Sequence, residues 1–261
     1  MIKQIVNEQP LGNLLKSLCL PTFASQYQSV AESFEQDGKT YTDYLQELAI
    51  RELEHRHQQR IARLLKQAKL SRDKLLSNFD IKRIPGLSST KIQYLVQGEF
   101  MDRYENILIF GNPGTGKSHL SIGLAREWCL TGRKVFYTTA ASLVQQLLEA
   151  KANLRLRQII KKFDYFEILI IDDISYVPYS REETDVLFTL LAERYEMRSV
   201  LITSNLVFAK WNTIFKDDMT TSAAIDRLVH HSTILELNTE SYRMKAAKVA
   251  KNHSHETTKK M

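Results

Sequence analysis

The sequence predicts an α/β protein built on a parallel sheet with helices on both faces, preceded by a small N-terminal α-helical domain. Short runs of apolar residues recur from Asn106 onward, and segments of helical character separate them. Strands that are apolar throughout must be covered on both faces, and their alternation with helices is typical of a parallel, doubly wound sheet. The first 75 residues contain few Gly or Pro and carry leucines at helical spacing, which predicts helices there.

The N-terminal region is predicted to contain two helical segments. The first carries Leu14, Leu15 and Leu18 at helical spacing, and Pro21 ends it. The second is one long helix, Thr42–Lys69. Its apolar side consists of Leu45, Leu48, Leu53, Ile61, Leu64 and Leu65.

The predicted sheet follows a turn at Ile84-Pro85-Gly86 and a loop through Ser89. Its strands cover Asn106–Phe110, Val135–Thr138, Ile168–Ile171, Val200–Thr203 and Thr233–Leu237. The helices between them cover Lys117–Thr131, segments running through Leu148 and Lys162, Glu182–Tyr195 and a stretch that ends near His231. In such a sheet ligands bind at the carboxyl ends of the strands, so the residues after each strand are expected to carry the function.

Length and composition are those of an ordinary globular chain. Its 261 residues suffice for one large domain, or for one small and one medium domain, and 43% of them are apolar. No apolar run reaches the roughly 18 residues of a transmembrane helix, and no secretory signal opens the chain. Cys19 and Cys129 cannot form a disulfide framework. We therefore expect a cytoplasmic protein without a membrane partner, and the net charge of +6 permits a nucleic-acid partner without requiring one.

The strongest chemical signal is a glycine-rich run between the first strand and the helix after it. It reads Gly111-Asn112-Pro113-Gly114-Thr115-Gly116-Lys117-Ser118 and fits the pattern G-x-x-x-x-G-K-[ST]. The glycines let backbone N–H groups turn toward phosphate oxygens, and the helix N-terminus adds partial positive charge. Lys117 can reach the β and γ phosphates, and the Ser118 hydroxyl can bind Mg²⁺. The run predicts a nucleotide site.

Polar residues follow two further strands. Asp172 and Asp173 end the run Ile168–Ile171, where Asp172 can hold the Mg²⁺ shell and Asp173 can polarise an attacking water. Asn205 follows Val200–Thr203 and can orient that water against the γ-phosphate. Asn alone is a common turn residue, but here it is the third polar group at a strand end. The set predicts hydrolysis of a bound nucleotide.

With these motifs the chain resembles the AAA+ ATPases, in particular the DnaA/DnaC-like branch, and within it the IstB-type helper ATPases of insertion-sequence transposition. The similarity is continuous over about residues 79–247, and the segment from Trp211 to Arg243 points to the IstB type. The stretches that carry the resemblance are Glu99-Phe100, Glu105-Asn106-Ile107-Leu108, Gly116-Lys117-Ser118-His119-Leu120, Ile202-Thr203-Ser204-Asn205-Leu206, Ala223-Ala224-Ile225-Asp226-Arg227-Leu228, His230-His231-Ser232 and Ser241-Tyr242-Arg243.

The resemblance implies ATP and Mg²⁺ as ligands and adds His119 to the nucleotide-binding residues. It also implies a homo-oligomer that assembles with ATP on duplex DNA, bends or remodels it, and recruits a transposase that in turn stimulates hydrolysis. The ATP sites would lie at subunit interfaces, where Arg227 would be the arginine finger of a neighbour's site. An ion pair with Asp226 is the alternative role for Arg227. Arg194 is a second finger candidate, although its acidic neighbours suit a solvated helix face.

The chain departs from most AAA+ proteins in two respects. The second acid after the strand is Asp173 rather than Glu, which is one methylene longer and reaches further toward the water. Only 34 residues follow Arg227, so a full C-terminal lid domain is not expected.

The expected domains are a helical domain over residues 1–75 and an ATPase domain over residues 76–250, followed by a disordered polar tail over residues 251–261. The role of Arg243 stays open.

Residues 151–162 form a basic segment without an acid. Its cations are Lys151, Arg155, Arg157, Lys161 and Lys162. On a helix Lys151 and Arg155 would lie one turn apart, as would Arg157 and Lys161. Initiator-type relatives insert an extra DNA-facing helix at this place, and the charges suit sequence-independent contacts with phosphates. A solvated helix face is the alternative, and residues 51–74 fit either a salt-bridged surface or a contact with DNA or transposase.

Other functions remain compatible with parts of the sequence. A DnaC-like helicase loader would share the fold and the ATP site. A nucleotide-gated DNA scaffold with little hydrolysis is kept open by Asp173, whereas a small-molecule P-loop kinase would have no use for the basic segment. The seven histidines lie on different predicted elements, so no zinc site is expected.

Overall fold

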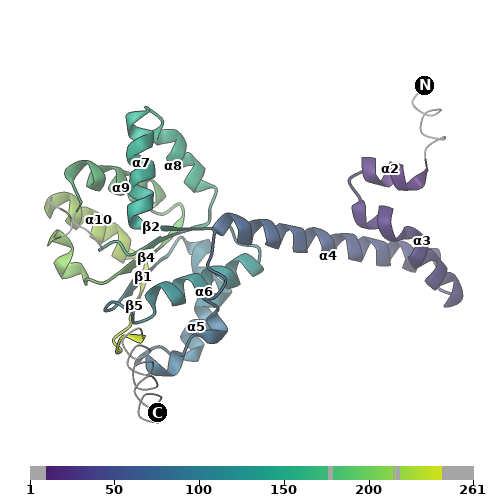
Figure 1. Ribbon diagram of the computed structural model, residues 1–261, viewed down its shortest axis with the longest axis horizontal. Coiled ribbons are helices and arrows are strands. Elements are labelled where there is room, and N and C mark those ends of the chain that lie inside the picture. Colours follow the sequence, from purple (N-terminus) through teal and green to yellow (C-terminus); the bar gives the residue numbers. More distant parts are fainter. Residues whose placement is uncertain (1–9, 176–178, 214, 216–217, 243–261) are drawn as a thin grey trace, which may run out of the picture. The chain divides into compact units, whose positions relative to one another are not determined.

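A computed structural model describes residues 10–175, 179–213, 215 and 218–242 (Figure 1). Arg243 and the tail expected over residues 251–261 lie outside the described residues. Contacts divide the chain into two compact units, Met1–Arg63 and Leu64–Met261. The division falls within helix α4 (Tyr41–Ala68), ahead of the boundary expected at residue 75, because Leu64 and Ala68 belong to the core of the second unit.

The first unit contains α2 (Leu11–Ser17), α3 (Pro21–Gln36) and most of α4. The prediction that a segment ends at Pro21 missed α3, in which Pro21 is the first residue, a position where its fixed φ and missing N–H cost nothing. The buried Glu52 carboxylate accepts the backbone N–H of Thr22 at 2.9 Å and so joins α4 to the start of α3. Leu48 is buried, but Leu45 is exposed on the same helix.

The second unit contains a five-stranded parallel sheet in the order β2-β3-β4-β1-β5. Its strands are β1 (Asn106–Phe110), β2 (Val135–Thr139), β3 (Ile168–Asp172), β4 (Ser199–Ser204) and β5 (Ser232–Glu236). Each lies within one residue of its predicted bounds at either end. The α/β prediction is confirmed.

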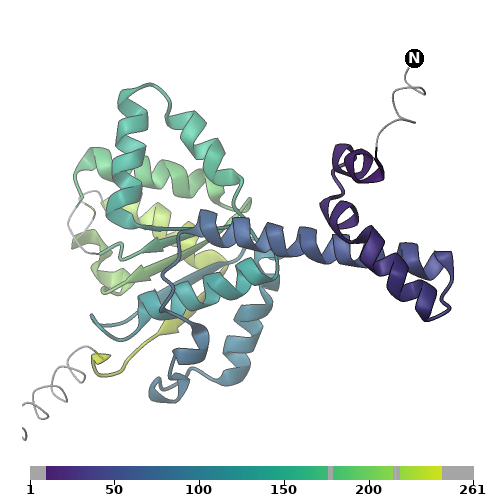
Figure 2. The ribbon, with the colours of Figure 1, turned by 45° about the vertical axis from the view of Figure 1, so that its right-hand side comes forward.

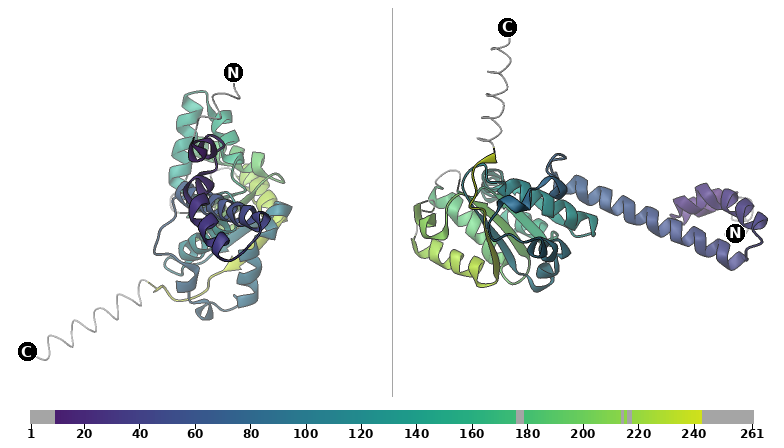
Figure 3. Two further views of the ribbon diagram at one scale, coloured as in Figure 1. Left: turned by 90° about the vertical axis from the view of Figure 1, so that its right-hand side faces the viewer. Right: turned by 90° about the horizontal axis from the view of Figure 1, so that it is seen from below.

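Helices cover both faces of this sheet (Figures 1 and 2). One face carries the end of α4, α5 (Ser89–Gln97) and α6 (Lys117–Leu130), and Ile107 and Ile109 of β1 point into its core. The other carries α7 (Ala140–Ala152), α8 (Leu156–Asp164), α9 (Arg181–Arg194) and α10 (Asp218–His230). Leu108 and Phe110 point into that second core, and α9 and α10 lie side by side within it (Figure 3).

The connection from α4 to the sheet is more ordered than the predicted loop. Three short 3₁₀ helices lie here: η1 (Leu76–Asn78), η2 (Ile81–Arg83) and η3 (Glu99–Arg103). The Ser88 hydroxyl caps α5 by accepting the Lys91 N–H at 3.1 Å, so Ser89 begins a helix and does not belong to a loop.

The strand β5 is the last element of the described residues. No helix of the described part is long and apolar enough to cross a membrane.

The basic segment is divided between two helices, so the spacing considered for its cations on a helix applies to one pair only. α7 ends at Ala152 and α8 begins at Leu156, with Leu154 in the left-handed region at φ 56°. Lys151 and Arg155 therefore do not lie one turn apart on a common helix. Arg157 and Lys161 do, because both belong to α8.

Candidate nucleotide-binding site

The glycine-rich run forms the turn from β1 into α6. Gly114 and Gly116 adopt φ values of 82° and 103°, which other residues rarely reach. A Cβ at Gly116 would lie 3.0 Å from the Phe79 ring, and one at Gly114 would collide with the side chain of Ser241. The loop is thus packed closely on both sides, and only glycine fits at these two positions.

Lys117 opens α6 and is almost completely buried at the base of the loop. Its Nζ donates to the carbonyl oxygens of Gly111 and Asn112 at 2.7 and 3.0 Å and to Asn205 Oδ1 at 2.5 Å. The ammonium is therefore held inside the turn toward which phosphate oxygens would be drawn.

Asp172, the last residue of β3, accepts hydrogen bonds from three hydroxyl groups. Ser118 Oγ and Thr203 Oγ1 donate to its Oδ1 at 3.0 and 2.6 Å. Tyr137 donates to its Oδ2 at 2.7 Å, and burial together with the negative charge of Asp172 raises the pKa of Tyr137 far above the usual value. Hydroxyl and carboxylate oxygens are the donors that Mg²⁺ prefers, so Ser118 and Asp172 fit that ion.

Asp173 continues the chain with a left-handed backbone, at φ 59°. Its N–H donates to Thr203 Oγ1 at 2.8 Å, and its Oδ1 accepts from Asn205 Nδ2 at 2.9 Å. The Asn205 amide therefore contacts both Lys117 and Asp173. The predicted residues at the ends of β1, β3 and β4 form one connected set of hydrogen bonds.

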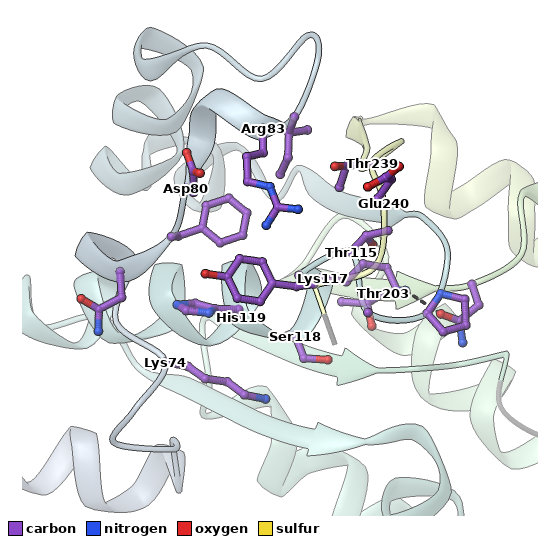
Figure 4. A pocket seen from close by; sticks show the side chains of 18 of the residues that line it. Lys74, Asp80, Arg83, Thr115, Lys117, Ser118, His119, Thr203, Thr239 and Glu240 are labelled. Atoms are coloured by element: carbon purple, nitrogen blue, oxygen red, sulfur yellow. Dashed lines mark hydrogen bonds between the residues drawn. The ribbon is translucent and has the colours of Figure 1, made fainter. Parts of the chain in front are cut away.

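A pocket of about 330 Å³ opens above this set (Figure 4). Of the residues predicted for the nucleotide site, Pro113 to His119, Asp173 and Asn205 line it, whereas Gly111, Asn112 and Asp172 lie outside its lining. The rest of the lining carries no sequence motif that predicts a ligand. These residues include Lys74, Asn78, Phe79, Asp80, Arg83, Thr239, Glu240 and Tyr242. Those before the P-loop, Gly111–Ser118, lie in the connection of short 3₁₀ helices and turns that follows α4, which no spacing rule marks. Tyr242 belongs to a stretch quoted for the resemblance.

Three contacts hold the walls of the pocket in place. His119 Nε2 lies 2.7 Å from the Leu75 carbonyl oxygen, which ties the connection after α4 to α6. On the other side the Tyr242 N–H donates to the Gly114 carbonyl at 2.8 Å, and the Arg83 guanidinium lies 4.7 Å from the centre of the Tyr242 ring. His119 and Tyr242 thus join segments from before and after the sheet to the P-loop.

Arg227 lies elsewhere, beside the opposite end of β1. It is exposed on α10, next to Leu228, whose carbonyl accepts from the Asn106 side chain at 3.3 Å. Asn106 begins β1, whereas the P-loop follows Phe110 at its end. Among the residues that the structure describes, no carboxylate lies within ion-pair distance of the Arg227 guanidinium, Asp226 included.

Arg194 does not lie on a solvated helix face, as its acidic neighbours suggested. It is 1% exposed, and its guanidinium donates to three carbonyl oxygens. These belong to Phe163 at 2.8 Å, Phe166 at 3.1 Å and Ser199 at 3.0 Å. Burial lowers the pKa of Arg194 to about 10. A side chain enclosed in this way cannot reach a neighbour's phosphate, which leaves Arg227 as the finger candidate.

All five cations of the basic segment are exposed, and none lines the nucleotide pocket. Lys151 Nζ lies 4.0 Å from a Glu182 carboxylate oxygen.

The histidines are less scattered than expected, because ligand atoms of His230, His231 and Glu196 lie within 4.8 Å of one another. All three are exposed, at the end of the sheet away from the P-loop.

Fold and site together define a P-loop ATP-binding protein of the AAA+ class. The same fold occurs in the AMPPCP-bound DnaA from Aquifex aeolicus, with a TM-score of 0.55 and 19% identity over 71% of this chain and 56% of that one. A family model described as IstB-like ATP binding protein matches residues 13–250, and the chain belongs to this family.

Two relatives carry names from insertion sequences. A protein of Sinorhizobium fredii, named as an ATP-binding protein of an insertion sequence, is 40% identical over 97% of this chain and 85% of its own length. A protein of Pseudomonas aeruginosa, named as an ATP-binding protein of insertion sequence IS21, is 35% identical over 91% of this chain and 89% of its own. The predicted family is confirmed.

Proposed function

We propose that the protein is an ATP-dependent helper of transposition that oligomerises on duplex DNA, remodels it, and recruits a transposase that stimulates its ATP hydrolysis. The observation that carries the proposal is the connected set of Lys117, Asn205, Asp173 and Asp172 at the strand ends. It occurs in a chain whose relatives are named for insertion sequences.

Each member of the set has a distinct task in hydrolysis. Ser118 and Asp172 would hold Mg²⁺, which neutralises charge on the phosphates. Lys117 would turn from the carbonyls of its own loop to the β and γ phosphates. Asp173 would then accept a proton from the attacking water, which Asn205 orients through its contact with the carboxylate.

The position of Arg227 supports a site shared between subunits. Within one chain it lies beside the start of β1, and the P-loop lies after the end of that strand. A guanidinium placed there can offset the charge that develops on a γ-phosphate only in a second copy. The proposal is therefore a homo-oligomer with ATP at its interfaces.

The exposed basic segment supports contact with duplex DNA. From Ala150 to Phe163 the chain has five cations and no acid, and its cations are directed to solvent. Contacts of this kind with phosphates position a protein without reading sequence. The ion pair of Lys151 with Glu182 joins two exposed side chains, so it does not compete strongly with a phosphate.

A helicase loader is the second candidate, because the fold of the DnaA/DnaC-like branch serves both tasks. A direct binding assay separates the two. The protein is mixed, with ATP and DNA, either with the transposase encoded beside its gene or with the replicative helicase of the host. We expect the transposase to bind and to raise the rate of ATP hydrolysis. Binding of the helicase alone would favour the loader.

Replacement of Asp173 tests the hydrolytic part of the proposal. Asp173→Asn leaves Lys117, Ser118 and Asp172 in place, so we expect ATP binding to persist while single-turnover hydrolysis falls at least about 100-fold and DNA complexes live longer. Asp173→Glu, with the longer acid of most AAA+ sites, is the matched control and should keep activity or raise it. Hydrolysis by Asp173→Asn at the wild-type rate would instead favour a nucleotide-gated scaffold.

A further inference from the structure

The turn between α7 and α8 presents an aliphatic side chain to solvent within the basic segment. Leu154 is 95% exposed. Arg155 follows it directly, and Lys151 and Arg157 lie three positions away on either side, all of them exposed. The turn lies at the outer end of the pair formed by α7 and α8 (Figures 1 and 2). Single exposed apolar residues are common, so exposure alone assigns no role to Leu154.

The backbone of this turn makes the leucine unusual. The Leu154 N–H donates to the Lys151 carbonyl at 3.0 Å, and the Arg155 N–H donates to the Ala150 carbonyl at 2.7 Å. This pair of hydrogen bonds ends a helix at a left-handed residue, a position that is usually glycine. Leu154 occupies it at φ 56°, where a side chain with a Cβ costs about 1 kcal/mol or more.

Folding of the isolated chain does not account for a leucine at this position. Glycine would remove the backbone strain and the exposed apolar surface together. Six described residues other than glycine have positive φ, and Leu154 is the one branched aliphatic residue among them. The six are Cys19, Lys69, Tyr104, Leu154, Asp173 and Glu196. The cost of Leu154 therefore points to a contact made with another molecule.

We propose that Leu154 is a wedge that inserts between base pairs of duplex DNA while the cations beside it contact the phosphates. Apolar wedges of this kind partly unstack a base step and bend the duplex, and flanking cations offset the cost. The charge of the segment favours DNA over a protein surface, since residues 150–163 contain no acid and, among the described residues, the one carboxylate paired with them, Glu182, lies 4.0 Å from Lys151. The inference rests on the proposed DNA binding and adds the residue through which the duplex is remodelled.

The test replaces Leu154 by Gly in the full-length protein and uses a duplex of arbitrary sequence. The duplex carries 2-aminopurine to report unstacking and a dye at each end to report bending. For Leu154→Gly we expect a thermal midpoint equal to or above that of wild type and an unchanged dependence of binding on salt. The 2-aminopurine signal and the bend should fall at least about threefold. Leu154→Met, which keeps an apolar side chain, should retain most of both signals.

A charge-reversed variant separates the wedge from the binding that it depends on. Arg155→Glu, Arg157→Glu and Lys161→Glu together should weaken binding on every sequence and lower the slope of log K against log salt by roughly 0.9 for each phosphate that is no longer neutralised. Wild-type protein that binds no duplex would overturn the proposed function and the wedge with it. Duplex bound by wild type without unstacking, or unstacked equally by Leu154→Gly, overturns the wedge alone. Normal bending by Leu154→Gly without stimulation by transposase would assign the leucine to a protein interface and overturn the wedge as well.

Discussion

At the scale of single residues, the Thr203 hydroxyl positions both acids of the site. It donates to Asp172 Oδ1 and accepts the backbone N–H of Asp173, and the side chain has no exposed surface. One oxygen atom therefore fixes the position of Asp172, proposed to hold Mg²⁺, relative to Asp173, proposed to activate the water. It also satisfies a backbone N–H that has no strand partner at the point where the chain turns into the left-handed region.

Thr203→Val removes this hydroxyl at nearly constant volume. We expect it to lower the free energy of unfolding by about 1–3 kcal/mol, because the Asp173 N–H is left without a partner. The rate of ATP hydrolysis should fall more than the affinity for ATP, since Lys117 and the P-loop are unchanged. Thr203→Ser keeps the hydroxyl and is the control. Urea denaturation measures the loss of stability, and the hydrolysis rate beside a nucleotide titration measures the loss at the site. If Thr203→Ser lost as much stability and hydrolysis as Thr203→Val, the missing methyl group and not the hydroxyl would be responsible.

At the scale of elements, Arg194 joins the end of α9 to the end of α8 and to the start of β4. Its guanidinium bonds the carbonyls of Phe163 and Phe166, at the end of α8 and just after it, and that of Ser199, at the start of β4. The ends of helices and strands commonly leave such carbonyls without a partner. The Phe163 carbonyl also accepts the Phe166 N–H at 3.0 Å, so Arg194 adds a second donor there. The pKa of Arg194 is lowered to about 10, so the group is still charged near neutral pH and its bonds to carbonyls are charge-assisted.

Arg194→Ala should therefore destabilise the protein strongly. We expect a loss of about 3–5 kcal/mol in the free energy of unfolding, because three charge-assisted hydrogen bonds to buried carbonyl oxygens are lost and a cavity opens. Arg198→Ala is the matched control: its Nε donates to the Asp164 carbonyl at 3.0 Å from a partly exposed position, and its loss should cost about 1 kcal/mol. Similar urea midpoints for Arg194→Ala and Arg198→Ala would contradict the stabilising role given to the buried Arg194 guanidinium.

The elements differ in how far the sequence could predict them. The five strands follow from their apolar runs. Burial on both faces leaves few other arrangements for β1, β3 and β4, whereas the edge strands β2 and β5 are partly exposed. Helix α3 was missed because Pro21 can end one helix or begin another, and only the packed structure decides between these. The position of the break between α7 and α8 was not predicted, because Leu154, which follows the end of α7, is not the glycine that usually marks such a position.

The candidate site shows the same division. The side formed by the strand ends was predictable, since a P-loop and polar residues at strand ends must meet at one edge of a parallel sheet. The contact of Tyr137 with Asp172 was not, because it depends on the register that places Thr139 beside Asp172. The wall formed by Phe79, Asp80 and Arg83 depends on the path of an irregular connection. No local pattern encodes such a path.

At the scale of the whole molecule, the two ends of β1 carry the two halves of the proposed ATP site. Lys117→Ala removes the cation of the phosphate side, and Arg227→Ala removes the finger. We expect each variant alone to lose ATP hydrolysis, with Arg227→Ala still binding ATP. Because a mixed interface can pair an intact P-loop with an intact finger, mixing the two should restore about a quarter of the activity. Mixed oligomers that form without any recovery would rule out action between subunits.

The P-loop and Arg227 lie at opposite ends of one strand, which would also give the proposed assembly a direction. Copies that join finger to phosphate associate head to tail, which produces either a closed ring or an open helix. In an open helix the first copy presents a vacant ATP site and the last an unused arginine. DNA held along it is contacted by subunits that all point the same way. A transposase approaching the two termini of such a filament therefore meets chemically different surfaces, and this difference would direct insertion to one side of the bound DNA.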